Sequence, residues 1–152
     1  MPKIRLTKKF NLEMGHSLYD YDGPCSNIHG HSYVLFVTVI GEPSLDKSHT
    51  KYGMVMDFKE LKSIIITNII ARFDHALVLN SKTPESLINE MNKIYNKIIV
   101  VDYQPTCENL LIEFVDIIRE NIVGAVKLSN VKLAETTSSF AEWHAEDNDI
   151  SY

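Results

Sequence analysis

Alternating apolar and polar residues predict two long strands in the first 40 positions of the chain. Apolar side chains keep one parity from Ile4 to Met14, interrupted only at Lys8, and His16 continues that parity. A β-branched, apolar run over residues 29–40 predicts the second strand. Residues 18–26 contain aspartate, glycine and proline. We therefore expect strands over 4–16 and 29–40, joined by a polar loop.

Helical spacing follows from Asp57 onwards. Asp57 can cap a first turn with Glu60 three residues on, as in a capping box, and apolar residues then recur at helical spacing over 61–73. A threonine followed by a proline predicts a short helix over 83–95. Thr106 is expected to cap a further long helix.

Strand-like patterns return later in the chain. A short β-branched run occupies 98–101, a longer strand is predicted over 126–136, and another over 140–144. The main order, ββααββ, indicates an α+β fold. Its sheet is expected to be antiparallel, because loops between successive strands are too short for crossovers. We expect one domain over 1–152 and a frayed polar tail over 146–152.

Composition narrows the functional classes. The net charge of −5 argues against nucleic-acid binding, although a small anionic substrate remains compatible with it. Two cysteines are too few for a disulfide framework, which fits a reducing compartment. The N-terminus lacks the apolar segment of a secretory signal, and no apolar run is long enough to span a bilayer. These features predict a cytoplasmic protein without a membrane partner.

Three histidines form the main candidate site. His29 and His31 lie two residues apart at the start of a strand, so their side chains point to one face. His16 ends the preceding strand, and antiparallel pairing would bring all three imidazoles together. Three histidines with an open fourth position are typical of catalytic zinc. A zinc hydrolase and a non-catalytic, zinc-stabilised interaction module are the alternative functions for this site. Two further histidines, His49 and His144, are expected at the surface.

Cys25 is the candidate reactive thiol. It lies four residues before His29 in a polar loop, whereas buried cysteines usually lie in apolar runs. A nearby metal would activate this thiol, but Cys25 is also a possible fourth zinc ligand. Cys107 begins a helical turn, where its pKa can be lowered, and is interpreted as a bystander.

Two acidic positions complete the candidates. Asp74 directly precedes His75 after a long helix, so it can orient that imidazole, although a plain helix-end histidine is the simpler interpretation. Glu135 shares a predicted strand face with Val131 and Leu133 and therefore needs a partner. That partner is expected to be a ligand with adjacent N–H donors, or a lysine.

Several motifs follow one another along the chain. One runs from Cys25 to His31 with the sequence CSNIHGH. The others are residues 10–16, 53–58 (GMVMDF), 73–75 (FDH), 105–109 (PTCEN) and 135–139 (ETTSS). Together they resemble the 6-pyruvoyltetrahydropterin synthase and 6-carboxytetrahydropterin synthase family. The resemblance covers nearly the whole chain, apart from a possible insertion around 81–97 and the tail.

The resemblance implies a fold, an assembly and a metal. The fold is the tunnelling fold, an antiparallel sheet with helices packed on one face. The assembly is a homohexamer of two trimers with active sites at subunit interfaces. His16, His29 and His31 would hold Zn²⁺, and Cys25 would be the catalytic thiol.

The resemblance also implies roles for the remaining candidates. Asp74 and His75 would form the acid–base relay. Glu135 would be a catalytic residue that also anchors the pterin. Thr106 and Glu108 would lie near the pterin pocket.

Spacing around the thiol divides the family. Members that make 6-carboxytetrahydropterin have three residues between the cysteine and the first histidine, and members that make 6-pyruvoyltetrahydropterin usually have five. Folate-pathway members commonly carry a glutamate near the cysteine. Here Ser26, Asn27 and Ile28 intervene and the loop has no glutamate. The resemblance thus favours the carboxy branch of queuosine biosynthesis, acting on 7,8-dihydroneopterin triphosphate; elimination of triphosphate to the pyruvoyl product is the alternative.

Overall fold

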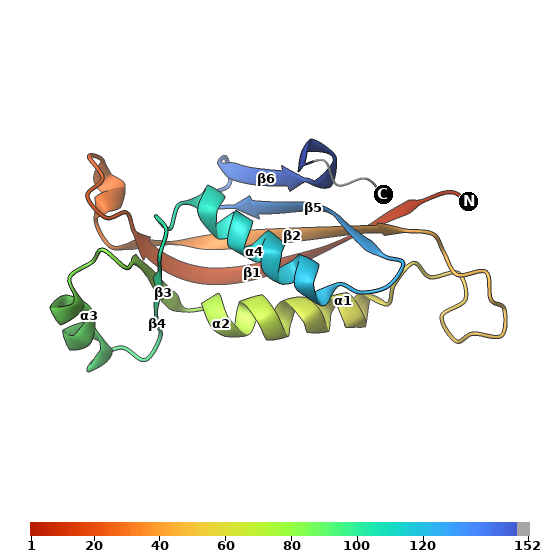
Figure 1. Cartoon of the computed structure of the whole chain (residues 1–152), viewed down its shortest axis with the longest axis horizontal. Coiled ribbons are helices and arrows are strands. Elements are labelled where there is room, and N and C mark those ends of the chain that lie inside the picture. The colour runs from red at the N-terminus through yellow and green to blue at the C-terminus, as the bar shows by residue number, and fades with distance from the viewer. Residues whose placement is uncertain (149–152) are drawn as a thin grey trace.

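A six-stranded sheet in the order β4-β3-β1-β2-β5-β6 is the frame of the computed structural model, which describes residues 1–148 (Figure 1). The strands are β1 (Ile4–Ser17), β2 (His29–Gly41), β3 (Ala76–Asn80), β4 (Ile98–Val101), β5 (Lys127–Ala134) and β6 (Phe140–His144). The predicted strands in both terminal regions are confirmed within a few residues.

Helices cover one face of this sheet. The helices are α1 (Phe58–Ile65), α2 (Ala71–Phe73), α3 (Glu85–Asn92) and α4 (Cys107–Asn121). A π-helical turn, Ile66–Ile70, joins α1 to α2, and together they lie beside α4 on the same side of the sheet (Figure 1). The short α3 lies beyond one end of the sheet. Among residues 1–148, no helix has both the length and the apolarity that a membrane crossing requires.

The predicted parity of the first two strands is confirmed. β1 and β2 pair antiparallel from Ile4 opposite Gly41 to His16 opposite His29. Even positions of β1 and odd positions of β2 face the helices, and Leu12 is only 1% exposed. The sheet face that carries the histidines is therefore the face that builds the core.

The expectation of an antiparallel sheet holds for β1, β2, β5 and β6, but the whole sheet is mixed. β3 pairs parallel with β1, and β4 pairs parallel with β3. The segment between β3 and β4, residues 81–97, contains α3 and supplies the crossover that parallel neighbours need. This segment, where the family resemblance indicated a possible insertion, connects two strands of the sheet.

The helix starts agree only partly with prediction. Thr106 caps α4 as expected, because its Oγ1 accepts from the Asn109 N–H at 3.3 Å. Asp57 caps α1 through Lys59, but the Glu60 side chain pairs with Lys51 at 2.8 Å, so no capping box forms.

The other differences lie at α3 and at the tail. The helix predicted over 83–95 begins only after Pro84, at Glu85, and ends at Asn92. In the predicted frayed tail, residues 145–148 form a short 3₁₀ turn, and 149–152 lie outside the described residues.

Candidate active site

Three imidazoles meet where β1 ends and β2 begins. His16 lies directly opposite His29 in the strand pair, and His31 follows two residues later on the same face. Their ring centroids are 4.5 Å (His16 to His29), 5.0 Å (His29 to His31) and 5.3 Å (His16 to His31) apart. In residues 1–148, these histidines are the only group of three or more possible metal ligands whose ligand atoms all lie within 4.8 Å of one another. The group can bind a metal ion and does not include Cys25.

The hydrogen bonds of two histidines leave lone pairs that face each other. His16 Nδ1 donates to the Pro105 carbonyl at 2.7 Å, and His29 Nδ1 donates to the Asn27 carbonyl at 2.8 Å. Burial lowers the pKa of His16, which favours its neutral form. In the neutral rings the two Nε2 atoms, 3.0 Å apart, are therefore both acceptors.

This donor set fits zinc. Two nitrogens bound to one tetrahedral Zn²⁺ lie about 3.3 Å apart. A shared cation would turn the repulsion between the two lone pairs into attraction, and carbonyl acceptors on Nδ1 are the usual partners of metal-bound imidazoles. Zinc also suits imidazole ligands by its chemistry.

Glu135 borders the histidine cluster. Its Oε1 lies 3.7 Å from Nε2 of both His16 and His31, and it accepts a hydrogen bond from the Tyr33 hydroxyl at 3.1 Å. Burial, followed by the negative charge of Glu135, raises the pKa of Tyr33, so the hydroxyl keeps its proton. Within the described residues, Glu135 contacts Tyr33, His16 and His31, and the expected ligand partner stays a prediction.

Sequence reasoning missed Tyr33, although its signal was present. Tyr33 continues the parity of His29 and His31 along β2, and its side chain is fully buried. A polar group on an otherwise apolar strand face, two residues beyond two candidate ligands, marks a position that needs a hydrogen-bond partner.

The loop between β1 and β2 places Cys25 near the cluster. The thiol belongs to a 3₁₀ turn, Pro24–Ser26, and is half-buried. The carbonyl of Cys25 accepts from the Leu18 N–H at 2.9 Å. Ser17 Oγ donates to the Ser26 carbonyl at 2.9 Å, so the backbone of this turn lies against the residues that directly follow His16.

The second cysteine is held as a neutral thiol. Cys107 Sγ donates to the Leu133 carbonyl at 3.4 Å. Burial, followed by the charge of Glu135, raises the pKa of Cys107 to about 11. Its location at the start of α4 therefore does not lower the pKa of Cys107. Its thiol is a poor nucleophile near neutral pH.

Asp74 and His75 form the expected pair at the start of β3. Asp74 Oδ2 lies 3.0 Å from His75 Nδ1, and Asp74 Oδ1 accepts from the Glu13 N–H at 2.8 Å. Slight burial favours a higher pKa of Asp74, but these two hydrogen bonds hold that pKa below its usual range. His75 has φ of 59° and a side chain 77% exposed. Lys97 Nζ donates to the Asp74 carbonyl at 2.6 Å and fixes this turn.

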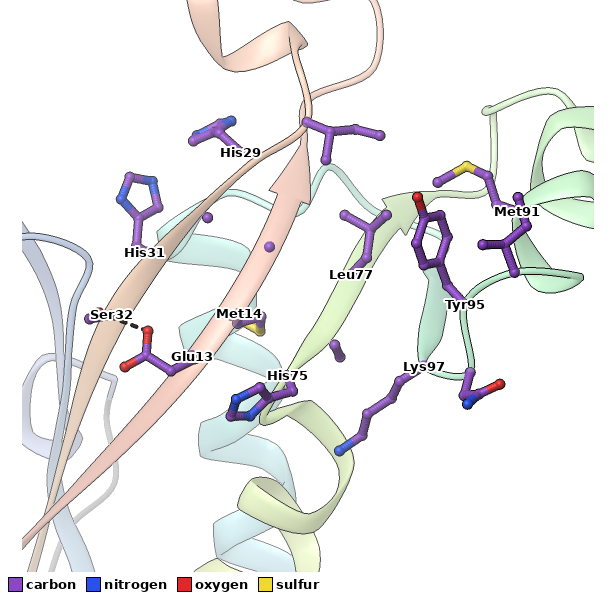
Figure 2. Close-up of a pocket in the computed structure, with 16 residues that line it drawn as sticks. Glu13, Met14, His29, His31, Ser32, His75, Leu77, Met91, Tyr95 and Lys97 are labelled. Atoms are coloured by element: carbon purple, nitrogen blue, oxygen red, sulfur yellow. Dashed lines mark hydrogen bonds between the residues drawn. The ribbon is translucent and has the colours of Figure 1, made fainter.

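Within one chain, the Asp74–His75 pair lies apart from the histidine cluster. His75 lines a groove of about 1180 Å³ together with Glu13, Ser32 and Lys97 (Figure 2). Glu13 and Ser32 have the parity opposite to that of the three ligands, so they line the groove from the sheet face that the helices leave uncovered. His29 and His31 also line this groove, but their imidazoles lie apart from that of His75 (Figure 2).

The remaining predicted residues occupy different environments. Thr106 Oγ1 is engaged as the cap of α4, whereas Glu108 is exposed on its first turn. Of the two histidines expected at the surface, His49 lies in the exposed loop between β2 and α1, and the half-exposed His144 has Nε2 3.8 Å from Glu142.

Comparison with known proteins identifies the family. The model of 6-pyruvoyl tetrahydropterin synthase matches residues 5–146. The 6-carboxy-5,6,7,8-tetrahydropterin synthase of Haemophilus influenzae is 31% identical over 142 residues, covering 92% of this chain and 98% of the relative. That of Aquifex aeolicus is 30% identical over 169 residues, covering 95% and 99%.

Solved structures share the fold. An uncharacterized protein from Wolinella succinogenes superposes with a TM-score of 0.78 at 20% identity, covering 95% of this chain and 99% of the other. The Caenorhabditis elegans 6-pyruvoyl tetrahydropterin synthase superposes with a TM-score of 0.65 at 22% identity, covering 95% and 96%. The tunnelling-fold prediction is confirmed, and the chain belongs to the 6-pyruvoyl tetrahydropterin synthase family.

Proposed function

We propose that the protein is a zinc-dependent 6-carboxy-5,6,7,8-tetrahydropterin synthase. It converts 7,8-dihydroneopterin triphosphate and one water to 6-carboxy-5,6,7,8-tetrahydropterin, acetaldehyde and triphosphate, for queuosine and other 7-deazapurines. The observation that carries this proposal is the cluster of His16, His29 and His31, which Glu135 borders and whose first two members flank the Cys25 loop. The short spacing between Cys25 and His29 and the names of the relatives support the carboxy branch.

The chain's residues divide the chemistry among them. Bound zinc would supply a Lewis acid that lowers the pKa of the substrate's side-chain hydroxyls. Cys25, as a thiolate, accepts a proton from the substrate. His75, oriented by Asp74, is the complementary acid–base group. Glu135 accepts N–H bonds from the amino-pyrimidine edge of the pterin, with Thr106 and Glu108 near that pocket.

Assembly completes the proposed site. His75 lines the same groove as His29 and His31 but lies apart from both imidazoles (Figure 2), so the acid–base pair and the metal cluster are separate parts of the site within one chain. A homohexamer of two trimers with interfacial sites, as the family resemblance implies, would supply both halves from different subunits. Both edges of the sheet, β4 and β6, are also available for pairing between chains.

Product analysis tests the reaction. With a proton removed next to a polarised oxygen, the side-chain carbon–carbon bond cleaves in retro-aldol fashion and releases a two-carbon fragment. The zinc-loaded protein with 7,8-dihydroneopterin triphosphate is therefore expected to release acetaldehyde in proportion to the triphosphate, measured by a coupled dehydrogenase and by mass spectrometry of the pterin. Triphosphate release without acetaldehyde, with a pyruvoyl product, would instead assign the sister activity that names the family model.

A further inference from the structure

The loop that carries Cys25 has little apolar packing to hold it. None of the side chains of residues 18–26 is buried. Two hydrogen bonds close its base: the Leu18 N–H donates to the Cys25 carbonyl at 2.9 Å, and Ser17 Oγ donates to the Ser26 carbonyl at 2.9 Å. The position of this loop relative to the metal cluster therefore depends on polar contacts with the rest of the chain.

The side chain of Gln104 provides such a contact at the base of the loop. Its Oε1 accepts from the Tyr19 N–H at 2.9 Å, and its Nε2 donates to the Tyr19 carbonyl at 2.8 Å. The amide thus pairs with one residue in both directions, as a neighbouring β-strand would. Tyr19 directly follows Leu18, whose N–H binds the Cys25 carbonyl.

Gln104 is itself held from the other side. Its carbonyl accepts from Asn109 Nδ2 at 2.9 Å in the first turn of α4. Its Oε1 also accepts from Asn80 Nδ2 at 3.3 Å, at the buried end of β3. Gln104 is therefore held through its backbone by α4 and through its side chain by β3.

The next residue supports the metal cluster. The Pro105 carbonyl accepts from His16 Nδ1 at 2.7 Å and orients that imidazole. Residues 104 and 105 thus contact the thiol loop and a metal ligand, respectively, from one short segment. The relative position of the two parts of the site is set by the covalent geometry of that segment.

We propose that Gln104 is a positioning residue that holds the Cys25 loop beside the three-histidine cluster through the backbone of Tyr19. The proposal rests on the proposed role of Cys25. A primary amide suits this role because it offers an acceptor and a donor side by side, whereas methionine of similar length offers no donor and only a weak acceptor. A displacement of about 1 Å at a reacting group can cost about 100-fold in rate.

The test compares full-length, zinc-loaded Gln104→Met with Asn121→Leu. Asn121 loses a single amide contact, from Nδ2 to the Ile117 carbonyl, at the opposite end of α4. For Gln104→Met we expect about one zinc per chain, faster amide exchange at Leu18 and Tyr19, and unchanged exchange in the paired parts of β1 and β2. We expect kcat to fall about 10- to 100-fold with KM unchanged. Asn121→Leu should change none of these quantities.

Three results would overturn the proposal. Unchanged exchange over residues 18–26 would show that Gln104 does not hold the loop. Faster exchange together with a wild-type kcat would show that the contact between Gln104 and Tyr19 does not position the thiol. Zinc loss without faster exchange would place Gln104 in support of His16 instead. Exchange and zinc content do not depend on turnover, so they test the support of the loop even if the wild-type protein makes no tetrahydropterin.

Discussion

His29→Ala is expected to lose most of the bound zinc and to lower turnover by at least about 10³-fold. The substitution removes one of three ligand nitrogens and leaves two, which is too few for a stable site with an open position. A catalytic metal supplies several kcal/mol of transition-state stabilisation, and each 1.36 kcal/mol is a factor of ten in rate. Zinc content by elemental mass spectrometry and turnover by acetaldehyde release measure the two effects.

His49→Ala is the matched control, because His49 lies in an exposed loop outside the cluster. It is expected to keep full zinc content and turnover. Circular dichroism of His29→Ala separates a catalytic metal from a structural one. Because an extensive core packs between the sheet and its helices, the variant is expected to stay folded. Unfolding on metal loss would favour the alternative of a zinc-stabilised module. Full zinc retention in His29→Ala would contradict the assigned ligands.

Cys25→Ala is expected to keep about one zinc per chain but to lower kcat by about 10²- to 10⁴-fold, the usual contribution of a positioned acid–base group. The reason is that the three histidines form the ligand group without Cys25. Zinc content and single-turnover kinetics on the same preparation measure both properties.

Cys107→Ala serves as the control for the loss of a thiol. Cys107 is held neutral by its raised pKa of about 11 and donates to the Leu133 carbonyl, so its removal should leave kcat nearly unchanged. If Cys25→Ala lost its zinc, Cys25 would be a ligand and the proposed catalytic role would be wrong. If Cys107→Ala lost activity instead, the reactive thiol would be the one in α4.

The histidine cluster was predictable because it depends on local rules. His29 and His31 share a strand face by parity, and antiparallel pairing of β1 with β2 brings His16 opposite His29. The short connection between these strands makes that pairing the simplest one. The same parity extended by two residues identifies Tyr33, so this residue was within reach of the sequence.

Other features depend on contacts between distant segments and could not be predicted from local patterns. The short apolar runs of β3 and β4 do not reveal that β3 joins β1 in parallel, because strand order is decided by packing of the helices over the whole sheet. Gln104 lies 85 residues from Tyr19, and no periodicity relates the two. Glu60 could complete a capping box, but the loop before α1 offers Lys51 as a competing partner.

The position of the metal itself tests the central claim most directly. Crystals of the zinc-loaded protein, measured at wavelengths on both sides of the zinc absorption edge, would locate the ion by anomalous scattering. We expect one anomalous peak per chain, about 2.0–2.1 Å from a ring nitrogen of each of His16, His29 and His31. The fourth position should be open to solvent or substrate, with the Cys25 sulfur nearby but not bound. No peak at these histidines, or a peak with Cys25 as a fourth ligand and no open position, would contradict a catalytic three-histidine zinc site.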